Sequence, residues 1–273
     1  MTAATQPSRT ELRARLSRSP LVVMLDIDGT LAPLQSRPED SFVPEPTREA
    51  VVALVNAPDV HVALVTGRSA ADGRRLAKVD GAWVIGNHGI EAISPAGEAV
   101  VDASAAPYRD YIAAAVEDLS TLFRSAPGVR VEDKVWTLSV YYRLADPGIE
   151  PRLRQAMDDV GHKHGLRLIR GKKIFELRPP IHVHKGTAVI ELCRLIAGPG
   201  LAASLFYAGD DRTDEDAFRS LRSSAPHAVT VRVGSAADDQ TAATAAEFTV
   251  PNEDALRALL EWMATLRDGS RRR

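Results

Sequence analysis

Seven charged or hydroxyl side chains lie where regular elements are expected to begin or end, and these residues could do chemistry. They are Asp26, Asp28, Thr66, Lys185, Asp210, Asp211 and Asp214. Groups at the carboxyl ends of neighbouring parallel strands meet at one edge of the sheet. The five carboxylates among them would resist ionisation at close quarters unless cations were present. With all-oxygen ligands and no nearby Cys or His, the set predicts a Mg²⁺ site.

A lysine, a hydroxyl and a hard cation together suit a phosphoryl group, because all three can contact its oxygens. Phosphoryl transfer needs positioning and charge neutralisation more than covalent chemistry. A calcium loop starting at Asp26 is a weaker interpretation, since its sixth and twelfth positions should be Gly and Glu, and the chain has Leu31 and Arg37. Residues 66–68 alone fit an ordinary strand-to-helix turn, and residues 210–211 alone fit helix caps. Their joint occurrence in this order favours a phosphoryl-transfer site.

An alternation of short apolar runs and helical periods predicts the elements that position these residues. A continuous apolar run such as residues 21–25 is typical of a strand buried on both faces, as in a parallel sheet. Further strands are expected at 60–65, 82–86, 204–209, 230–234 and 247–251. Helices are expected at 8–18, 44–58, 69–79, 185–196 and 252–266, with another between the strands ending at 209 and starting at 230. Strands that alternate with helices predict right-handed crossovers and an α/β fold.

The pattern changes in the middle of the chain, after a hairpin expected at 91–101. A helix, two strands, a helix and two more strands are expected at 107–126, 129–133, 135–143, 151–165, 166–170 and 173–179. We therefore expect residues 1–103 and 185–273 to form one domain and residues 104–184 to form an inserted α+β domain. An insert at this point would cover the site as a lid and supply specificity.

Two pairs of charged residues in the insert have the spacing of one strand face. Glu132 and Lys134 are two residues apart in sequence, and so are Glu176 and Arg178, which puts each pair on one side of its strand. Such groups suit the hydroxyls of a sugar. The alternative is that they are exposed strand charges with no role in binding, and spacing alone favours that alternative.

Four motifs together resemble the haloacid dehalogenase superfamily of phosphohydrolases. They are DIDGT at 26–30, VTGR at 65–68, Lys185, and GDDRTDED at 209–216. The resemblance covers the whole chain and implies a doubly wound, Rossmann-like parallel sheet with an inserted α+β cap. It implies that Asp26 attacks phosphorus and forms an aspartyl-phosphate, and that Asp28 is the general acid and base. Thr66 and Lys185 would hold the phosphoryl oxygens.

The same resemblance implies a ligand set for Mg²⁺ and a class of reaction. The metal would be bound by Asp26, by the backbone carbonyl of Asp28 and by Asp210. Asp211 and Asp214 would support these ligands. An Asp at position 28, rather than Thr or Ser, favours a phosphatase over an ion pump or a dehalogenase.

Several segments are similar to those of trehalose-6-phosphate phosphatases: GNHGIE at 86–91, EDK at 132–134, YYR at 141–143 and GKKIFELRP at 171–179. The similarity implies that Glu132, Lys134 and Glu176 contact trehalose. The other candidate substrate-binding residues lie in these segments or in VTGR; they are Arg68, Asn87, His88 and Arg178. That family often has His-Tyr-Arg where this chain has Tyr-Tyr-Arg, so no role is inferred for Tyr141.

These observations predict a Mg²⁺-dependent phosphatase that hydrolyses trehalose 6-phosphate to trehalose and phosphate. The alternatives are a phosphatase of another phosphosugar, such as mannosyl-3-phosphoglycerate or sucrose phosphate, a phosphomutase, and a sugar-phosphate sensor without catalysis. The complete set of predicted catalytic residues argues against a sensor, because a pure binder needs no nucleophile.

Bulk composition limits the other function classes. The chain has 273 residues, of which 45% are hydrophobic and 26% charged, and a net charge of -2, so it has no basic field that would favour nucleic acid. No apolar run approaches the ~18 residues of a membrane span. The single cysteine, Cys193, is expected in a helix core and fits a reducing compartment. His182 and His184 are expected in a hinge strand rather than at a zinc site. We expect a cytoplasmic monomer acting on a small phosphosugar.

Overall fold

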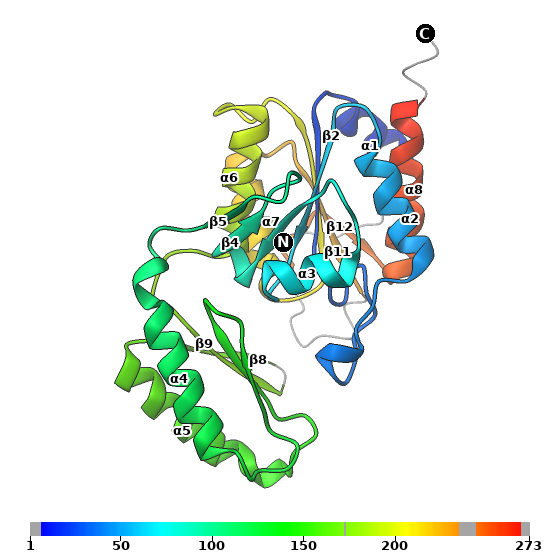
Figure 1. The fold of residues 1–273 in the computed structure, drawn as a ribbon. Coiled ribbons are helices and arrows are strands. Elements are labelled where there is room, and N and C mark those ends of the chain that lie inside the picture. The colour runs from blue at the N-terminus through cyan, green and yellow to red at the C-terminus, as the bar shows by residue number, and fades with distance from the viewer. Residues whose placement is uncertain (1–6, 172, 235–243, 269–273) are drawn as a thin grey trace. The chain divides into compact units, whose positions relative to one another are not determined.

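The chain divides into two compact units, each with its own sheet (Figure 1). The computed structural model describes residues 7–171, 173–234 and 244–268; Lys172 of the GKKIFELRP segment lies outside them. The core unit comprises Met1–Val100 and Val183–Arg273, and the cap unit comprises Val101–His182. The sequence placed these divisions after residues 103 and 184.

The core unit is built on one eight-stranded sheet with the order β12-β11-β10-β1-β2-β3-β4-β5. Its strands are β1 (Leu21–Leu25), β2 (Val60–Val65), β3 (Trp83–Gly86), β4 (Glu91–Ile93), β5 (Ala99–Val101), β10 (Ser204–Gly209), β11 (Val229–Val233) and β12 (Phe248–Val250). The pairs from β12 to β3 are parallel, and β4 runs antiparallel to β3. The chain starts at the centre, moves outward through β2 and β3, and later returns beside β1 as β10. Ligands bind outside the carboxyl ends of the strands at such a reversal of strand order.

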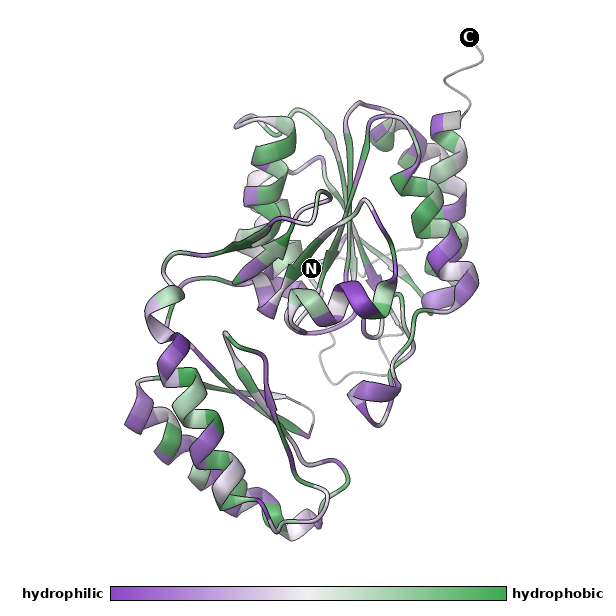
Figure 2. Ribbon diagram, viewed as in Figure 1, coloured by the Kyte–Doolittle hydropathy of each residue, from purple (hydrophilic) through white to green (hydrophobic). Residues whose placement is uncertain are grey.

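Helices cover both faces of this sheet, which confirms the predicted doubly wound α/β fold. One face packs against α1 (Arg9–Leu16), α2 (Glu45–Val55), α3 (Ala70–Ala77) and α8 (Glu253–Asp268), and the other against α6 (Lys185–Ala197) and α7 (Asp214–Ser224). All of β1 is buried, with Leu21 and Val23 on the first face and Val22 and Met24 on the second. Burying each such side chain contributes about 1.5–3 kcal/mol. The apolar colour of the central strands in Figure 2 follows from this two-sided burial.

The cap unit has its own sheet and its own hydrophobic core. Strands β6 (Arg130–Asp133), β7 (Leu138–Tyr141), β9 (Ile174–Arg178) and β8 (Arg167–Gly171) are antiparallel in that order, and α4 (Arg109–Leu122) and α5 (Glu150–His164) pack against one face. The register neighbours Leu138 and Leu177 lie in this core. Because side chains alternate along a strand, the residues between them lie on the other face. Glu132, Ser139 and Glu176 are register neighbours there, and we call this side of the sheet the polar face of the cap.

Most predicted elements are present, but two local expectations are wrong. The strand expected at 135–143 is confined to Leu138–Tyr141, because the backbone bends at Val135, which has a φ of +70°. No hinge strand forms at His182 and His184. His184 instead caps α6, since its Nδ1 accepts a hydrogen bond from the Gly186 N–H at 3.1 Å.

Cys193 is buried within α6, as its apolar surroundings predict. Burial raises the pKa of its thiol to about 12, so the thiol stays protonated and acts as a packing group. Among the described residues, no helix combines the length and the apolar character that crossing a membrane requires.

Candidate active site

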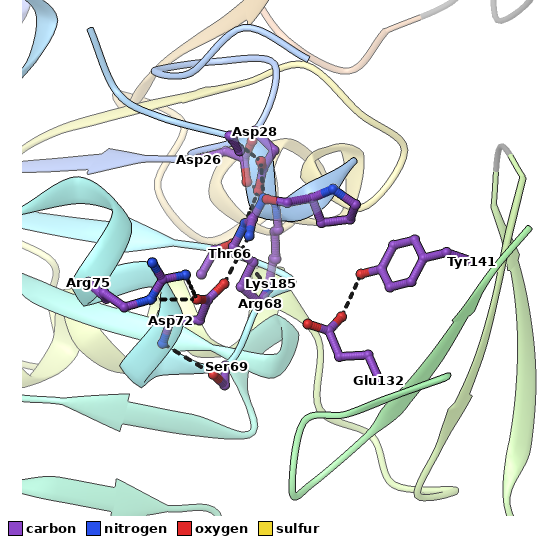
Figure 3. Close-up of polar contacts among 12 residues, drawn as sticks. Asp26, Asp28, Thr66, Arg68, Ser69, Asp72, Arg75, Glu132, Tyr141 and Lys185 are labelled. Carbon is purple, nitrogen blue, oxygen red and sulfur yellow. Dashed lines mark hydrogen bonds and ion pairs between the residues drawn. The ribbon is translucent and has the colours of Figure 1, made fainter. Parts of the chain in front are cut away.

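Asp26 lies directly after the central strand β1 and is almost fully buried. Its backbone N–H donates to the Ala208 carbonyl at 2.9 Å, which fixes it beside β10. Lys185, the first residue of α6, reaches the same point, with its Nζ 2.6 Å from Asp26 Oδ1 and 2.8 Å from Asp214 Oδ1. Thr66 is buried at the end of β2. Figure 3 shows Asp26, Thr66 and Lys185 gathered at this end of the sheet.

The two carboxylates keep the buried Lys185 in its charged form. Only 2% of its side chain is exposed, and burial alone would lower its pKa. The charges of Asp214 and Asp26 outweigh burial and raise the pKa of Lys185 well above its ordinary value. The site therefore contains a fixed positive charge of the kind that stabilises negative charge on a reacting group.

Asp26, Asp210 and Asp214 form a cluster in which one carboxylate oxygen of each lies within 4.8 Å of the others. Burial raises the pKa of Asp26 to about 6, although the charge of Lys185 acts in the opposite direction. Burial, followed by the charge of Asp26, raises the pKa of Asp210 well above its usual value. The cluster also holds three carboxylates beside one ammonium group, that of Lys185, so its negative charge is not fully balanced by protein groups. A hard divalent cation with oxygen ligands fits this donor set.

Two glycines allow the loops that carry these acids to approach each other. Gly29 has a φ of +86°, and a Cβ at this position would overlap the Asp210 carboxylate. A Cβ at Gly209 would overlap Asp214. The Thr30 hydroxyl donates a hydrogen bond to Asp210 Oδ1 at 3.2 Å across the same gap. Close packing therefore requires glycine at both positions, and at Gly29 the backbone conformation requires it as well.

Asp214 accepts hydrogen bonds from four donors. Its Oδ1 accepts from Lys185 Nζ and from the Tyr207 hydroxyl, the latter at 2.6 Å. Its Oδ2 accepts from the backbone N–H groups of Asp210 and Asp211, each at 3.1 Å. This arrangement suits Asp214 for holding Lys185 and the loop in place. Nothing in the sequence marks Tyr207 as part of the site, because a tyrosine inside an apolar strand is usually a packing residue.

Asp211 and Asp28 are engaged differently from the three clustered acids. Asp211 is exposed. Its Oδ1 accepts hydrogen bonds from the N–H groups of Thr213 at 2.7 Å and Asp214 at 3.1 Å, and it therefore stabilises the turn that leads into α7. The Asp28 carboxylate pairs with Arg68, whose Nε lies 2.7 Å from Oδ2 and whose Nη2 lies 2.8 Å from Oδ1 (Figure 3). The sequence placed both acids in the site but did not show these partners.

The GNHGIE turn supports the loop after β2. Asn87 and His88 have positive φ values of 47° and 57°, a conformation that costs about 1–3 kcal/mol per residue. Their N–H groups donate to the carbonyls of Arg68 at 2.6 Å and Thr66 at 3.0 Å. A Cβ at Gly67 would overlap the His88 ring, so the ring lies directly against this loop. Asn87 and His88 thus shape the turn that presents Thr66.

Glu91 is a further residue of this turn that the sequence did not single out. Its Oε1 accepts from the Ala70 N–H at 2.8 Å and from Asn87 Nδ2 at 2.7 Å. It therefore links the turn to the first residue of α3, where a negative charge is favourable. A lone glutamate at the start of a short strand has no spacing pattern from which this role could be predicted.

The polar face of the cap carries the four charged residues predicted to bind sugar, in two groups. Glu176 contacts two cations: its Oε1 is 3.6 Å from Lys134 Nζ, and its Oε2 accepts from Arg178 Nε at 2.7 Å. These three side chains are buried. Glu132 has a separate partner, since its Oε2 accepts from the Tyr141 hydroxyl at 2.7 Å (Figure 3).

Tyr141, the position that departs from His-Tyr-Arg, has a clear structural role. Burial, followed by the charge of Glu132, raises the pKa of Tyr141 far above its ordinary value, so the hydroxyl stays protonated and donates to Glu132. The guanidinium of Arg130 lies 4.8 Å from the ring centroid, a cation–π contact. The sequence could not show this role, because it depends on the register in which Arg130 pairs with Tyr141 across β6 and β7.

Known proteins of one family resemble the chain over most of its length. The family model for trehalose-phosphatase matches residues 24–254, a range that includes the candidate residues of both units. The chain belongs to the trehalose-phosphatase family. This confirms the resemblance that the motifs indicated.

Individual relatives agree with this assignment. An uncharacterized glycosyl hydrolase of Mycobacterium tuberculosis is 37% identical over 239 residues, which are 86% of this chain and 18% of that protein. The trehalose-phosphate phosphatase of Mycobacterium avium is 35% identical over 232 residues, which are 84% of this chain and 58% of that protein. The crystal structure of a trehalose-6-phosphate phosphatase related protein has a TM-score of 0.78 and 27% identity, and the match covers 92% of this chain and all of that one. This trehalose-phosphatase family member thus spans less than two thirds of the length of both sequence relatives.

Proposed function

We propose that this chain is a Mg²⁺-dependent phosphatase that hydrolyses trehalose 6-phosphate to trehalose and phosphate. The observation that carries the proposal is the position of Lys185 Nζ, 2.6 Å from Asp26 Oδ1, inside a cluster of three carboxylates. Membership of the trehalose-phosphatase family supports the choice of substrate. The proposed enzyme is a cytoplasmic monomer, for which light scattering should give a mass near 29.5 kDa.

The proposed reaction consists of two displacements at phosphorus. A carboxylate oxygen of Asp26 attacks the phosphorus, and the bond from phosphorus to the sugar oxygen breaks as the aspartyl-phosphate forms. Asp28 donates a proton to the departing sugar oxygen. Water then attacks the phosphorus of the aspartyl-phosphate while Asp28 takes a proton from it. This second step releases inorganic phosphate and restores the Asp26 carboxylate.

Fixed positive charge stabilises the phosphoryl oxygens in both steps. Lys185 supplies one such charge, and Thr66 supplies a hydroxyl donor from the end of β2. The ligands proposed for Mg²⁺ are Asp26, the backbone carbonyl of Asp28 and Asp210. When bound there, the metal contributes charge neutralisation that the excess of carboxylates otherwise lacks.

Asp214 and Asp211 have supporting roles in this proposal. Asp214 orients the Lys185 ammonium through a contact of 2.8 Å and holds the backbone that carries Asp210. Asp211 stabilises the turn before α7. Both therefore act on the metal site through the residues that they position.

We assign the sugar-binding groups to the polar face of the cap. Glu132, Lys134 and Glu176 offer both acceptors and donors, which suits the hydroxyls of a disaccharide. Arg178 fixes Glu176 through the contact of 2.7 Å described above. In the core unit, the Asn87–His88 turn completes the proposed substrate-binding set by shaping the loop of Thr66.

Phosphate release tests both the chemistry and the substrate. The full chain should be assayed with and without Mg²⁺ on trehalose 6-phosphate, glucose 6-phosphate, sucrose 6-phosphate and mannosyl-3-phosphoglycerate. We expect Mg²⁺-dependent release with a clear preference for trehalose 6-phosphate. Activity on another phosphosugar alone would keep the core chemistry and reject the assignment of the cap residues. No release from any of them by folded protein with Mg²⁺ would reject the proposed function.

A further inference from the structure

The side chain of Arg68 is engaged by protein groups on every side. Besides its two contacts to Asp28, Nη1 donates to Asp72 Oδ2 at 2.9 Å and Nη2 donates to the Pro38 carbonyl at 3.0 Å. These four hydrogen bonds use most of the N–H groups of a guanidinium. Only 12% of the side chain is exposed. A phosphosugar would therefore have to displace protein partners in order to bind Arg68.

The three residues that accept these four hydrogen bonds come from separate segments of the core unit. Asp28 belongs to the loop after β1, Pro38 begins the short 3₁₀ helix Pro38–Asp40, and Asp72 lies in the first turn of α3. Figure 3 shows Arg68 between the Asp28 and Asp72 carboxylates. Because Asp72 and the Pro38 carbonyl hold the guanidinium from other directions, its orientation is set independently of Asp28.

The Asp28 carboxylate, in turn, depends on Arg68 for its orientation. Two parallel N–H···O contacts of 2.7 and 2.8 Å fix the plane of the carboxylate as well as its position. The Ser41 hydroxyl adds a contact of 2.9 Å to Oδ1. A lysine in place of Arg68 could preserve the charge but not this two-pronged geometry.

We propose that Arg68 is a positioning residue that acts through Asp28, and that it is not a ligand of the phosphosugar as its place in VTGR suggested. The inference rests on the proposed function, in which Asp28 transfers a proton to the leaving sugar oxygen. That transfer requires the carboxyl group to lie within hydrogen-bonding reach of the oxygen. Arg68 keeps the Asp28 carboxyl group within hydrogen-bonding distance of the leaving oxygen by holding it in one place.

The dependence on leaving group separates positioning from binding. A sugar alkoxide is a poor leaving group and needs a proton, whereas p-nitrophenolate leaves readily without one. Loss of a well-placed general acid therefore slows the first displacement on a sugar phosphate much more than on p-nitrophenyl phosphate. Loss of a phosphoryl-binding group would slow both substrates alike, and loss of a sugar-binding group would weaken binding of the sugar phosphate alone.

The experiment compares Arg68→Met and Arg68→Lys with the control Arg75→Met. Arg75 also pairs with Asp72, but it forms no hydrogen bond or ion pair with Asp28 within the described part of the chain, and its side chain is 70% exposed. Single-turnover release of trehalose from trehalose 6-phosphate and of p-nitrophenol from p-nitrophenyl phosphate should be measured with the full chain in excess and Mg²⁺ present. Enzyme excess isolates the first displacement, and varying its concentration separates the saturating rate from the half-saturation concentration.

We expect both Arg68 variants to lower the saturating rate on trehalose 6-phosphate by roughly 100-fold, within the range of general acid catalysis. The rate on p-nitrophenyl phosphate should stay within about threefold of the parent rate, because that step needs little proton transfer. Arg75→Met should match the parent on both substrates. Retained turnover of p-nitrophenyl phosphate also shows that the variant is folded. If Arg68→Met does not fold, the rates of Arg68→Lys on the two substrates test the role of Arg68 instead.

Three outcomes would overturn the role of Arg68. They are equal losses on both substrates, a higher half-saturation concentration for trehalose 6-phosphate at an unchanged saturating rate, and variants that behave like Arg75→Met.

A double-variant cycle with Asp28→Asn adds a direct check, since Arg68→Met should cause little further loss once Asp28 is gone. If Asp28→Asn itself shows no selective loss on trehalose 6-phosphate, the acid role in the proposed function fails and this inference fails with it. A selective loss in Asp28→Asn but not in the Arg68 variants rejects the inference alone.

Discussion

The core site and the polar face of the cap both bury carboxylates, but they balance the charge in different ways. In the core, burial raises the pKa of Asp26 to about 6 and that of Asp210 well above its usual value, although Lys185 lies beside them. In the cap, Glu176 contacts two cations, Lys134 and Arg178. A cluster with more carboxylates than cations favours an additional cation, whereas a carboxylate that already has two cations beside it does not, and the polar groups of the cap suit hydrogen bonds to a neutral molecule. The difference supports our proposal that the metal and the phosphoryl group bind in the core unit and the uncharged sugar binds at the cap unit.

Removing the nucleophile tests the core side of this comparison and should have the largest effect. Asp26→Asn should lower turnover of trehalose 6-phosphate by at least about 1,000-fold, because an amide cannot form the aspartyl-phosphate. The substitution also removes one repelling charge, so the melting temperature without metal should not fall. Phosphate release and thermal unfolding measure the two effects. Turnover above a few per cent of the parent rate in folded protein would contradict the covalent role.

Neutralising the central acid of the cap tests the other side. Glu176→Gln leaves two buried cations without their counter-charge, and losses for buried pairs are typically 2–5 kcal/mol. We expect the KM for trehalose 6-phosphate to rise by roughly 30- to 100-fold, or kcat to fall comparably, with little change on p-nitrophenyl phosphate. Glu150→Gln is the matched control, because Glu150 lies at the start of α5 and pairs with the exposed Lys173. Equal losses on both substrates would break the division of roles between core and cap.

The pH dependence of protein stability tests whether the core site holds uncompensated negative charge, as the comparison with the cap implies. The pKa of Asp26 is raised from 3.8 to about 6 in the folded state, so between these values the folded state binds more protons than the unfolded state. The free energy of unfolding of metal-free protein should therefore fall as the pH rises through this window, by about 2 kcal/mol. If the deprotonated acids bind Mg²⁺ as proposed, the metal should restore stability above pH ~6.

Thermal unfolding with EDTA or Mg²⁺ at pH 5.0 and 7.5 measures this effect. The increase in melting temperature on adding Mg²⁺ should be larger at pH 7.5, and Asp26→Asn should reduce that difference. An equal increase at both pH values would show that the clustered acids do not bind the metal.

A single hydroxyl in the cap should have the smallest effect. Tyr141→Phe removes the hydrogen bond to Glu132 and keeps the ring beside Arg130. A hydrogen bond to a charged group contributes about 1.5–3 kcal/mol. Because this bond only orients Glu132, we expect part of that loss in substrate binding, and the KM for trehalose 6-phosphate should rise about 3- to 10-fold. Turnover of p-nitrophenyl phosphate serves as the control and should not change. No change in KM for the sugar phosphate would mean that Glu132 does not need Tyr141 to be oriented.

The sequence was a good guide to groups that the fold brings together at strand ends. Asp26 and Lys185 lie 159 positions apart, yet their proximity follows from the expected parallel order of strands and from the position of Lys185 at a helix start. Apolar runs such as residues 21–25 predicted buried strands, because a strand that is buried on both faces has apolar side chains at nearly every position. Family motifs then supplied roles that composition and spacing alone did not.

The residues that hold the functional groups could not be predicted in the same way. Tyr207 meets Asp214 only because β10 turns its phenol toward α7. Arg68 reaches Asp28 through a loop whose path is set by Asn87 and Pro38. Such contacts depend on register and loop geometry, which are tertiary properties without a local pattern.

The strand order also has a consequence for the growing polypeptide. β1, which carries the nucleophile at its end, occupies the interior of the sheet, yet its neighbour β10 begins at Ser204. Pairings between such distant segments form late, because a long loop must close first. A nascent chain on the ribosome therefore exposes one edge of β1 until most of the protein has been synthesised. Lys185 is also synthesised late, so for most of this interval the chain lacks the lysine that the proposed reaction needs.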